Sequence, residues 1–347
     1  MDNSAIIEKR KKEHIDLCVN SDVAFDKKTT LLECVELNYQ ALPEINFSDV
    51  NLSTEFLGKQ FSFPFLVSAI TGGAQVSKKI NLNIAKACGE MGIGMGLGSM
   101  RAMMENPKLK ETYDVRSSDT KDIFLAGNIG AIQLPEYTPK QLNEIISSMD
   151  LNAIAIHLNA AQEAMQSEGD LHFSNLIEKI DEFSKELNVP VYVKEVGHGI
   201  SKEIVTKLNK TKIKAIDIQG AGGTSWTRVD SLRHEKSFGD VFRNVGIPTG
   251  QALIDIKKVI SQDKQIIASG GIRNGLDAIK CIVMGANMVG NALPILKAEQ
   301  KSYADLIDYL KNFKKEMEIA SFLLGCKNIT DLHNQKYLIT GKLKELV

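Results

Sequence analysis

The segment from His157 to Asp170 holds a dense group of side chains that could do chemistry. It begins within the apolar run Ala153–Leu158 and extends beyond it. A buried strand seldom continues directly into His, Asn, Gln and Glu. Gln162 and Glu163 are adjacent, so one could face a reacting carbon while the other holds a metal ion. A single carboxylate suits Mg²⁺, whose octahedron is usually completed by waters and phosphate oxygens. A polar loop with helix-capping roles would also explain these residues.

A second group of functional side chains lies near the start of the chain, where Arg10, Lys11 and His14 follow one another closely. A run of charge is usually the solvated face of a helix. Arginine, however, makes bidentate contacts to phosphate oxygens. A diphosphate site would explain this cluster together with Arg101, which follows another predicted strand.

Glycines at two successive strand ends indicate a phosphate site. The predicted strand Gln265–Ser269 ends in Gly270 and Gly271, and the next strand ends in the segment Gly290–Leu293. In this part of a barrel, backbone N–H groups and a helix N-terminus commonly bind phosphate. We therefore expect a phosphate-bearing cofactor or substrate here, and a plain turn is the alternative.

Lys194 and a row of alternating glycines allow more than one interpretation. Lys194 stands at a predicted strand end, where a lysine is either a Schiff-base nucleophile or a fixed positive charge. Gly92, Gly94, Gly96 and Gly98 alternate along one strand. Such a row indicates either tight packing inside a barrel or the close approach of a ligand.

Short apolar runs alternate with amphipathic stretches along the chain, and this alternation predicts an α/β fold with a parallel sheet. Eight such units over roughly 260 residues match a (β/α)8 TIM barrel better than a doubly wound open sheet. In that fold the strand ends named above meet at one face. The predicted strands are Phe65–Ile70, Gly92–Leu97, Ile123–Ile129, Ala153–Leu158, Val191–Val196, Ala215–Gln219, Gln265–Ser269 and Asn287–Gly290.

The remaining segments frame this barrel. Residues 1–60 precede the first strand and are predicted to form an N-terminal extension packed on the barrel, which itself spans residues 61–347. The stretch Thr224–Gly246 is expected to be a long irregular loop, of the kind that often forms a lid. Tyr303–Leu324 is an amphipathic helix candidate, followed by a compact polar end.

Composition excludes several classes of protein. Among 347 residues, 42 Lys and Arg balance 43 Asp and Glu, so a dedicated nucleic-acid binder is not expected. No apolar run of ~18 residues supports a membrane span. The five cysteines are widely spaced without a CxxC pair, which favours reduced thiols and a cytoplasmic location. The first residues lack the apolar core of a secretory peptide.

Taken together, these motifs resemble the type 2, flavin-dependent isopentenyl-diphosphate delta-isomerases. The resemblance runs from about residue 8 to beyond residue 293, and its most specific part is the string HLNxxQExxQxEGD that begins at His157 and includes Glu168. The other matching pieces are Arg10-Lys11-x-x-His14, Thr71-Gly72-Gly73, Gly98-Ser99-x-Arg101, Gly127-Asn128-Ile129-Gly130, Val193-Lys194-Glu195-Val196-Gly197, Gly220-x-Gly222-Gly223-Thr224-Ser225-Trp226, Gly246-Ile247-Pro248-Thr249 and Gly270-Gly271-Ile272-Arg273.

The resemblance implies a barrel that holds FMN, with Mg²⁺ and isopentenyl diphosphate against the flavin. It implies interconversion of isopentenyl and dimethylallyl diphosphate, redox-neutral overall, with reduced FMN as acid/base catalyst and NADPH only as its reductant. It implies catalytic roles for Gln162 and His157, and it implies that Glu163 is the Mg²⁺ ligand. The implied substrate contacts are Arg10, Lys11, His14, Ser99, Met100, Arg101, Asn159 and Gln162. The implied flavin contacts are Ile70, Thr71, Gly72, Ser99, Asn128, Lys194, Thr224, Gly270, Gly271, Arg273, Ala292 and Leu293.

Three points stay open at this stage. Gln219 stands where the family usually has a small residue, which puts the local flavin contact in doubt. The family commonly forms tetramers or octamers, so a homo-oligomer is implied. The alternatives are another FMN-dependent barrel oxidoreductase and a flavin-binding barrel without catalysis. The first is disfavoured because the segment Gly246–Asp255 offers no base histidine and the loop Gly220–Gly246 no reactive cysteine.

Overall fold

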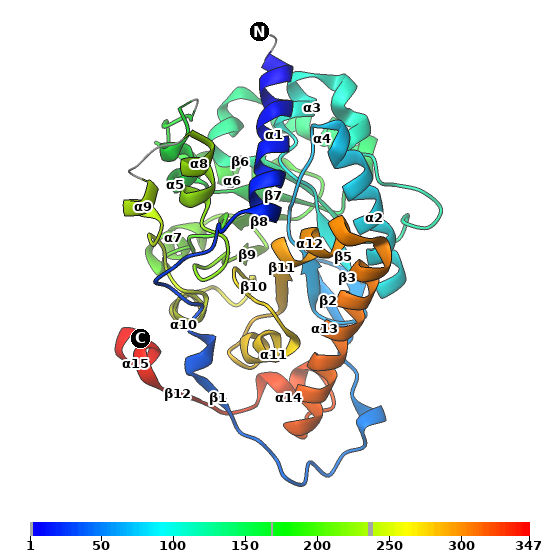
Figure 1. Cartoon of the computed structure of the whole chain (residues 1–347), viewed down its shortest axis with the longest axis vertical. Helices are drawn as coiled ribbons and strands as arrows, with labels where there is room; N and C mark the ends of the chain where they lie inside the picture. Colours follow the sequence, from blue (N-terminus) through cyan, green and yellow to red (C-terminus); the bar gives the residue numbers. More distant parts are fainter. Residues whose placement is uncertain (1–2, 168, 235–238) are drawn as a thin grey trace.

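The computed structural model describes residues 3–167, 169–234 and 239–347, and within them eight parallel strands close into a barrel (Figure 1). This confirms the predicted (β/α)8 fold and all eight predicted strand segments. Around the barrel the strand order is β10-β11-β4-β5-β6-β7-β8-β9. The strands are β4 (Phe65–Val67), β5 (Gly94–Gly96), β6 (Leu125–Gly130), β7 (Ala153–His157), β8 (Val191–Lys194), β9 (Ala215–Asp217), β10 (Gln265–Ser269) and β11 (Met288–Asn291).

Helices that follow the strands form the outer layer, and their ends carry clear sequence signals. Thr138 caps one helix with a capping box completed by Gln141, and Asn274 caps another by accepting from the N–H of Asp277. Their apolar stripes pack on the strands. The outer helices are α2 (Gln75–Met91), α4 (Pro139–Met149), α6 (Leu176–Glu186), α7 (Lys202–Leu208), α10 (Thr249–Lys257), α11 (Gly275–Val283), α12 (Leu293–Lys301) and α13 (Tyr303–Leu323).

Shorter elements connect this framework at the strand ends. Two of them, α3 (Arg101–Glu105) and α5 (Ala160–Met165), follow β5 and β7 at the carboxyl face of the barrel. The others are the 3-10 turns η1 (Leu32–Cys34), η2 (Phe47–Asp49), η3 (Pro107–Thr112) and η4 (Ala131–Glu136).

The N-terminal segment covers both ends of the barrel. Helix α1 (Asn3–Asn20) lies across the carboxyl face (Figure 1). The hairpin β2 (Thr54–Phe56) and β3 (Lys59–Phe61) closes the opposite end, where Phe56 and Phe61 pack on Phe124 just before β6. This hairpin spans residue 60, and the division of the chain there stays a prediction.

The stretch Thr224–Gly246 differs from the expected irregular loop, because it contains α8 (Trp226–His234) and α9 (Gly239–Phe242). Helix α8 lacks an apolar stripe, since Thr227, Asp230 and Ser231 are among its buried residues. Periodicity in hydrophobicity therefore could not reveal it. The polar end likewise contains α14 (Ile329–His333), β12 (Tyr337–Ile339) and α15 (Gly341–Leu346), and β12 pairs with β1 (Val35–Leu37).

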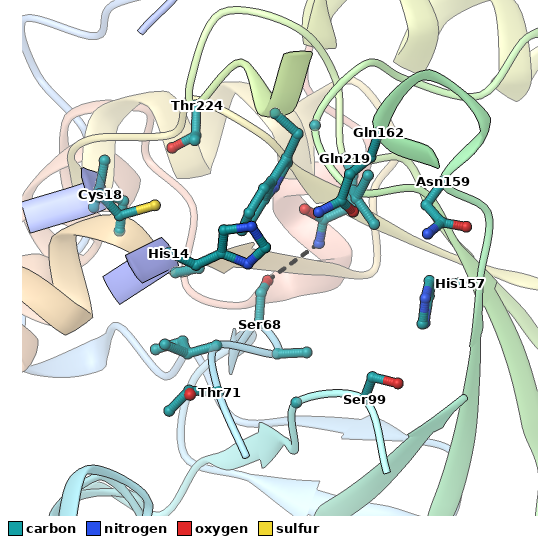
Figure 2. A pocket seen from close by; sticks show the side chains of 18 of the residues that line it. His14, Cys18, Ser68, Thr71, Ser99, His157, Asn159, Gln162, Gln219 and Thr224 are labelled. Carbon is teal, nitrogen blue, oxygen red and sulfur yellow. Dashed lines mark hydrogen bonds between the residues drawn. The ribbon is translucent and has the colours of Figure 1, made fainter. Parts of the chain in front are cut away.

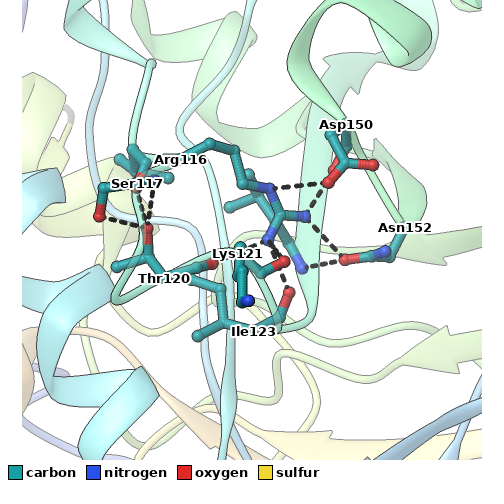
Figure 3. A network of polar contacts seen from close by, with 9 residues as sticks. Arg116, Ser117, Thr120, Lys121, Ile123, Asp150 and Asn152 are labelled. Carbon is teal, nitrogen blue, oxygen red and sulfur yellow. Dashed lines mark hydrogen bonds and ion pairs between the residues drawn. The ribbon is translucent and has the colours of Figure 1, made fainter.

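Arg116 organises the amino-terminal end of the barrel (Figure 3). Its Nη1 donates to the carbonyl oxygens of Thr120, Lys121 and Ile123 at 3.0, 3.0 and 2.9 Å. Its Nη2 donates to Oδ1 of Asn152, which directly precedes β7, at 3.0 Å. This network fixes the loop before β6 on the face opposite the functional end of a barrel.

Across the described ranges, no helix combines the length and the apolar character that a bilayer crossing requires.

Candidate active site

A cavity opens at the carboxyl face of the barrel (Figure 2). The strand ends form its floor, and α1 and α8 contribute to its walls through His14 and Trp226. Ligands of barrel enzymes bind at this face, in clefts where a few polar groups converge among apolar side chains. The lining of this cavity has the same character, with charged, amide and hydroxyl side chains beside Ile70, Ile272 and Leu293.

Arg10, Lys11 and Arg101 give one wall of the cavity a positive charge. Arg10 Nη1 donates to Gln166 Oε1 at 3.4 Å, and Arg101 Nε pairs with Glu105 at 2.7 Å. Within the described residues, the Lys11 ammonium has no hydrogen-bond or ion-pair partner. Burial, together with the charge of Arg10, lowers the pKa of Lys11 to about 8. An anion bound here would supply the missing counter-charge.

A buried carboxylate that sequence reasoning missed holds α1 against α8. Asp230 Oδ1 accepts from His14 Nε2 at 3.0 Å and from Arg233 Nη1 at 2.9 Å, and Oδ2 accepts from Gln166 Nε2 at 3.1 Å. Burial would raise the pKa of Asp230, but the hydrogen bonds from His14 and Gln166 and the charge of Arg233 outweigh it and lower the pKa. The His14 ring also contacts the edge of Trp226, with centroids 5.2 Å apart.

His157 is held as a neutral imidazole. Its Nδ1 lies 2.9 Å from Asn128 Oδ1, an oxygen that only accepts, so Nδ1 carries the proton and Nε2 is left as an acceptor. Burial, together with the charges of Lys194 and Lys11, lowers the pKa of His157 to about 3. The side chain therefore stays uncharged in neutral solution and can accept a hydrogen bond through Nε2.

Glu163 and Asn159 lie together on the cavity wall and are joined by a hydrogen bond. Glu163 Oε1 accepts from Asn159 Nδ2 at 2.6 Å, and Oε2 accepts from the N–H of Asp170 at 3.0 Å. Asn159 Oδ1 is buried and has no hydrogen-bond partner. Burial raises the pKa of Glu163, and the N–H of Asp170 and the Asn159 amide oppose this rise.

A divalent hard cation fits this oxygen pair. In the described part of the chain, no group of three or more His, Cys, Asp or Glu side chains could hold a metal ion. One carboxylate and one orphaned amide oxygen fit Mg²⁺, because Mg²⁺ keeps several waters and takes further oxygens from substrate phosphates. Bound there, the cation would also satisfy the buried amide oxygen of Asn159.

The glycines after β10 form a cradle for an anion. A Cβ at Gly270 would lie 2.1 Å from the Gly220 carbonyl oxygen, and one at Gly223 would lie 2.6 Å from the Gly271 nitrogen. Among the described residues, the N–H groups of Gly271, Ile272 and Ala292 donate to no backbone acceptor. Such free amides beside the start of α12 suit the phosphate of a flavin nucleotide.

The floor of the cavity contains a compact polar network. Asp217 Oδ1 accepts from Ser269 Oγ, and Oδ2 accepts from Gln219 Nε2 at 2.8 Å. Lys194 pairs with Asp217 in the register of β8 and β9, and its Nζ donates to the Glu195 carbonyl at 2.8 Å. Burial raises the pKa of Asp217 and lowers that of Lys194, and each group's charge opposes the other's shift.

Most residues that the sequence singled out line this one cavity. Met100 and Gly72 do not, because Met100 is fully buried as the residue before α3 and Gly72 packs against the ring of Tyr113. Glu168 of the motif lies outside the described residues. Those on the cavity wall are Arg10, Lys11, His14, Ile70, Thr71, Ser99, Arg101, Asn128, His157, Asn159, Gln162, Glu163, Lys194, Thr224, Gly270, Gly271, Arg273, Ala292 and Leu293.

Sequence reasoning gave no role to Gln166 or Asp230. Gln166 stood within the quoted motif, four residues after Gln162 at helical spacing, and this spacing was the available signal. Asp230 carried no signal, because only the packing of α8 on α1 buries it.

Comparison with protein families defines the class first. The family model described as FMN-dependent dehydrogenase matches residues 4–112 and 128–339. Among solved structures, a lactate oxidase from Pediococcus acidilactici aligns over 98% of this chain and 95% of its own with a TM-score of 0.69 at 17% identity. A flavocytochrome b2 variant aligns over 100% of this chain and 89% of its own, with a TM-score of 0.70 at 17% identity. At these identities the structural likeness supports the fold alone.

More similar relatives narrow the class. A protein from Methanocaldococcus jannaschii named isopentenyl-diphosphate delta-isomerase is 42% identical over 100% of this chain and 98% of its own length. A protein of the same name from Oceanobacillus iheyensis is 40% identical over 94% of this chain and 95% of its own length. The chain belongs to the FMN-dependent dehydrogenase family and, within it, to the isopentenyl-diphosphate delta-isomerases.

Proposed function

We propose that this protein interconverts isopentenyl diphosphate and dimethylallyl diphosphate, with FMN as cofactor and Mg²⁺ at the diphosphate. The observation that carries the proposal is that one cavity joins a wall of basic side chains to a glycine segment whose amides donate to no backbone acceptor. The glycine cradle near Gly271 suits the flavin phosphate, and the cationic wall around Lys11 suits a second phosphorylated molecule. The relatives at about 40% identity carry the name of this activity.

The diphosphate is bound by α1 and the strand ends together. Arg10, Lys11 and Arg101 supply the positive charge, and His14 has its Nε2 engaged with Asp230, which leaves Nδ1 for the ligand. Glu163, whose carboxylate accepts a hydrogen bond from Asn159, would hold the Mg²⁺, which would neutralise charge on the diphosphate. Binding energy from this remote group positions the alkene for reaction.

Moving the double bond requires one proton to be added to the alkene and another to be removed from a neighbouring carbon. The transition state therefore carries positive charge, which an electron-rich environment in a dry pocket stabilises. Reduced FMN, when bound, supplies an electron-rich ring with exchangeable protons, and NADPH serves only to reduce it. Because one proton is added and one is removed, the substrate neither gains nor loses electrons, and the reaction is redox-neutral overall.

The chain's own residues orient the substrate and exclude water. His157 is neutral, so its Nε2 accepts a hydrogen bond and does not compete as an acid. Gln162 lines the same wall, makes no hydrogen bond to the described residues, and is available to orient the substrate near the alkene. The rings of His14 and Trp226 pack together on the cavity wall, where they shield a bound substrate from solvent.

We also propose a cytoplasmic location and assembly into a homo-oligomer, a tetramer or an octamer. The five cysteines, all within described residues, are free, which fits a reducing compartment. The assembly is the form common among the isomerases that the chain resembles. Size-exclusion chromatography with light scattering measures the mass directly.

The decisive experiment follows the reaction in D₂O. Purified protein is incubated anaerobically with FMN, NADPH, Mg²⁺ and isopentenyl diphosphate, and NMR records product and deuterium uptake. We expect dimethylallyl diphosphate that carries solvent deuterium and forms only when the flavin is reduced. A protein that binds FMN but leaves the substrate unchanged would contradict the proposal and favour an oxidoreductase or a non-catalytic flavin barrel.

A further inference from the structure

Gln219 has an unusual backbone at the end of β9. Its φ is 45°, in the left-handed region, although it is not glycine. Residues held in this region cost of order 1 kcal/mol or more, and they concentrate at binding and catalytic sites. The conformation is fixed from outside, since the Gln219 carbonyl accepts from the N–H of Gly199 at 2.8 Å. It turns the side chain back over the cavity floor, beside Ser68 (Figure 2).

Two neighbours fix which way the Gln219 amide points. Nε2 donates to Asp217 Oδ2 at 2.8 Å and to Ser68 Oγ at 3.4 Å. Both contacts place the nitrogen of the amide toward the floor of the cavity, so its oxygen points the other way. The Asp217 carboxyl and the Ser68 hydroxyl can each accept a hydrogen bond from this nitrogen.

The consequence is a fixed acceptor on the cavity floor. Gln219 is only 9% exposed and lines the cavity, and its Oε1 accepts no hydrogen bond from the described residues. The Gln219 oxygen is not among the fully buried unpaired atoms of the described residues, so it faces the open cavity. A bound molecule with an N–H or O–H group would donate a hydrogen bond to it there, in place of solvent.

We propose that Gln219 is a positioning residue for the flavin, with Oε1 accepting a hydrogen bond from the isoalloxazine N3–H. This inference rests on the proposed FMN site. N3–H is the one N–H donor of the oxidised isoalloxazine ring, and the other neutral donors of FMN are the hydroxyls of its ribityl chain. A flavin methylated at N3 therefore separates the proposed contact from a contact with a hydroxyl. The role differs from that of a small residue, which offers no side-chain acceptor at such a distance from the backbone.

The test combines a change in the protein with a change in the ligand. Apo-protein is titrated with oxidised FMN and with 3-methyl-FMN, and binding is followed by quenching of flavin fluorescence. Gln219→Met keeps the length of the side chain but removes the amide. Gln75→Met is the matched control, because Gln75 lies on the exposed face of α2, where its amide contacts Glu111. Circular dichroism and thermal unfolding verify that each variant is folded.

We expect Gln219→Met to weaken FMN binding about 3- to 10-fold, the range of one neutral hydrogen bond. Methylation of N3 should weaken flavin binding by the wild type and by Gln75→Met at least about 3- to 10-fold. In Gln219→Met the loss of affinity caused by methylation should be about 3-fold smaller than in the wild type. Equal methylation penalties in all three proteins would overturn the inference. So would unchanged or tighter FMN binding by Gln219→Met.

Gln219→Ser provides a second variant should the methionine variant unfold, because serine restores the small residue usual in the family. It is expected to lose the same selectivity for unmethylated flavin, and equal discrimination by this variant would also overturn the inference. Failure of the wild type to bind FMN at all would refute the proposed flavin site itself. Normal FMN binding without coupling to N3 would refute only the role of Gln219.

Discussion

Replacing Asp230 with asparagine should uncouple α1 from the cavity while leaving the barrel intact. The carboxylate is fully buried and receives hydrogen bonds from His14, Arg233 and Gln166 at 3.0, 2.9 and 3.1 Å. Asparagine keeps the shape and one acceptor oxygen. It loses the negative charge that strengthens each bond, and it places an amide NH₂ opposite the NH₂ of Gln166.

The size of the effect follows from these contacts. Each charge-assisted hydrogen bond that becomes neutral loses about 1 kcal/mol, and an unpaired buried donor costs about 1–3 kcal/mol. A loss of about 2 kcal/mol in the docking of α1 corresponds to about 30-fold in an equilibrium constant. Because α1 carries Arg10, Lys11 and His14, we expect KM for isopentenyl diphosphate to rise by at least about 30-fold, with a smaller fall in kcat.

The assay measures kcat and KM with reduced FMN, together with the Kd for FMN. The affinity for FMN should stay within about 2-fold of the wild type, since the glycine cradle near Gly271 is far from this network in the chain. Asp16→Asn, at an exposed position on α1, removes the same charge from the same helix and serves as the control. Unchanged KM in Asp230→Asn, or an equal rise in Asp16→Asn, would refute the reasoning.

Three further predictions follow from other parts of the structure. Glu163→Gln should bind FMN normally but lose Mg²⁺-dependent turnover, and full activity would remove the metal assignment. Lys11 has a pKa of about 8, so kcat/KM should fall as the pH rises through 8 and the ammonium loses its proton. In Lys11→Arg this fall should disappear, because the guanidinium keeps its charge. A variant with the same pH profile as the wild type would contradict the assignment. Arg116→Met removes the hydrogen bonds at the closed end of the barrel and should lower the free energy of unfolding in urea by about 2–4 kcal/mol. Its kcat and KM should be unchanged, and a lost activity in folded Arg116→Met would show that the network reaches the cavity.

The sequence predicted the barrel well because its signals are local. Each strand is a short apolar run such as Ala153–Leu158, and each neighbouring helix has its own stripe or cap, so the alternation could be read without knowing any tertiary contact. The site residues at the strand ends followed from the same reasoning, since parallel strands bring their carboxyl ends to one face. Lys194 and Gly270 were found in this way, from strands more than 70 residues apart.

Other features depend on contacts between distant segments. Helix α8 was expected to be a loop, because its inward residues are polar, and their partners include His14 on α1 and the Phe242 carbonyl of α9. The resemblance implied that Met100 contacts substrate, and this stays a prediction, but the structure buries its side chain away from the cavity. Neighbouring positions in a sequence do not specify which side chain faces a cavity.

The sequence by itself determined the order and type of the barrel elements and the set of polar residues at their ends, because these depend on local hydrophobic pattern and turn chemistry. Only the tertiary structure decided the protonation of His157, the docking of α1 by Asp230 and the direction of the Gln219 amide. Each of these depends on burial and on a hydrogen-bond partner supplied by a segment far away in the chain. Desolvation and pairing energies arise only once those segments are packed together.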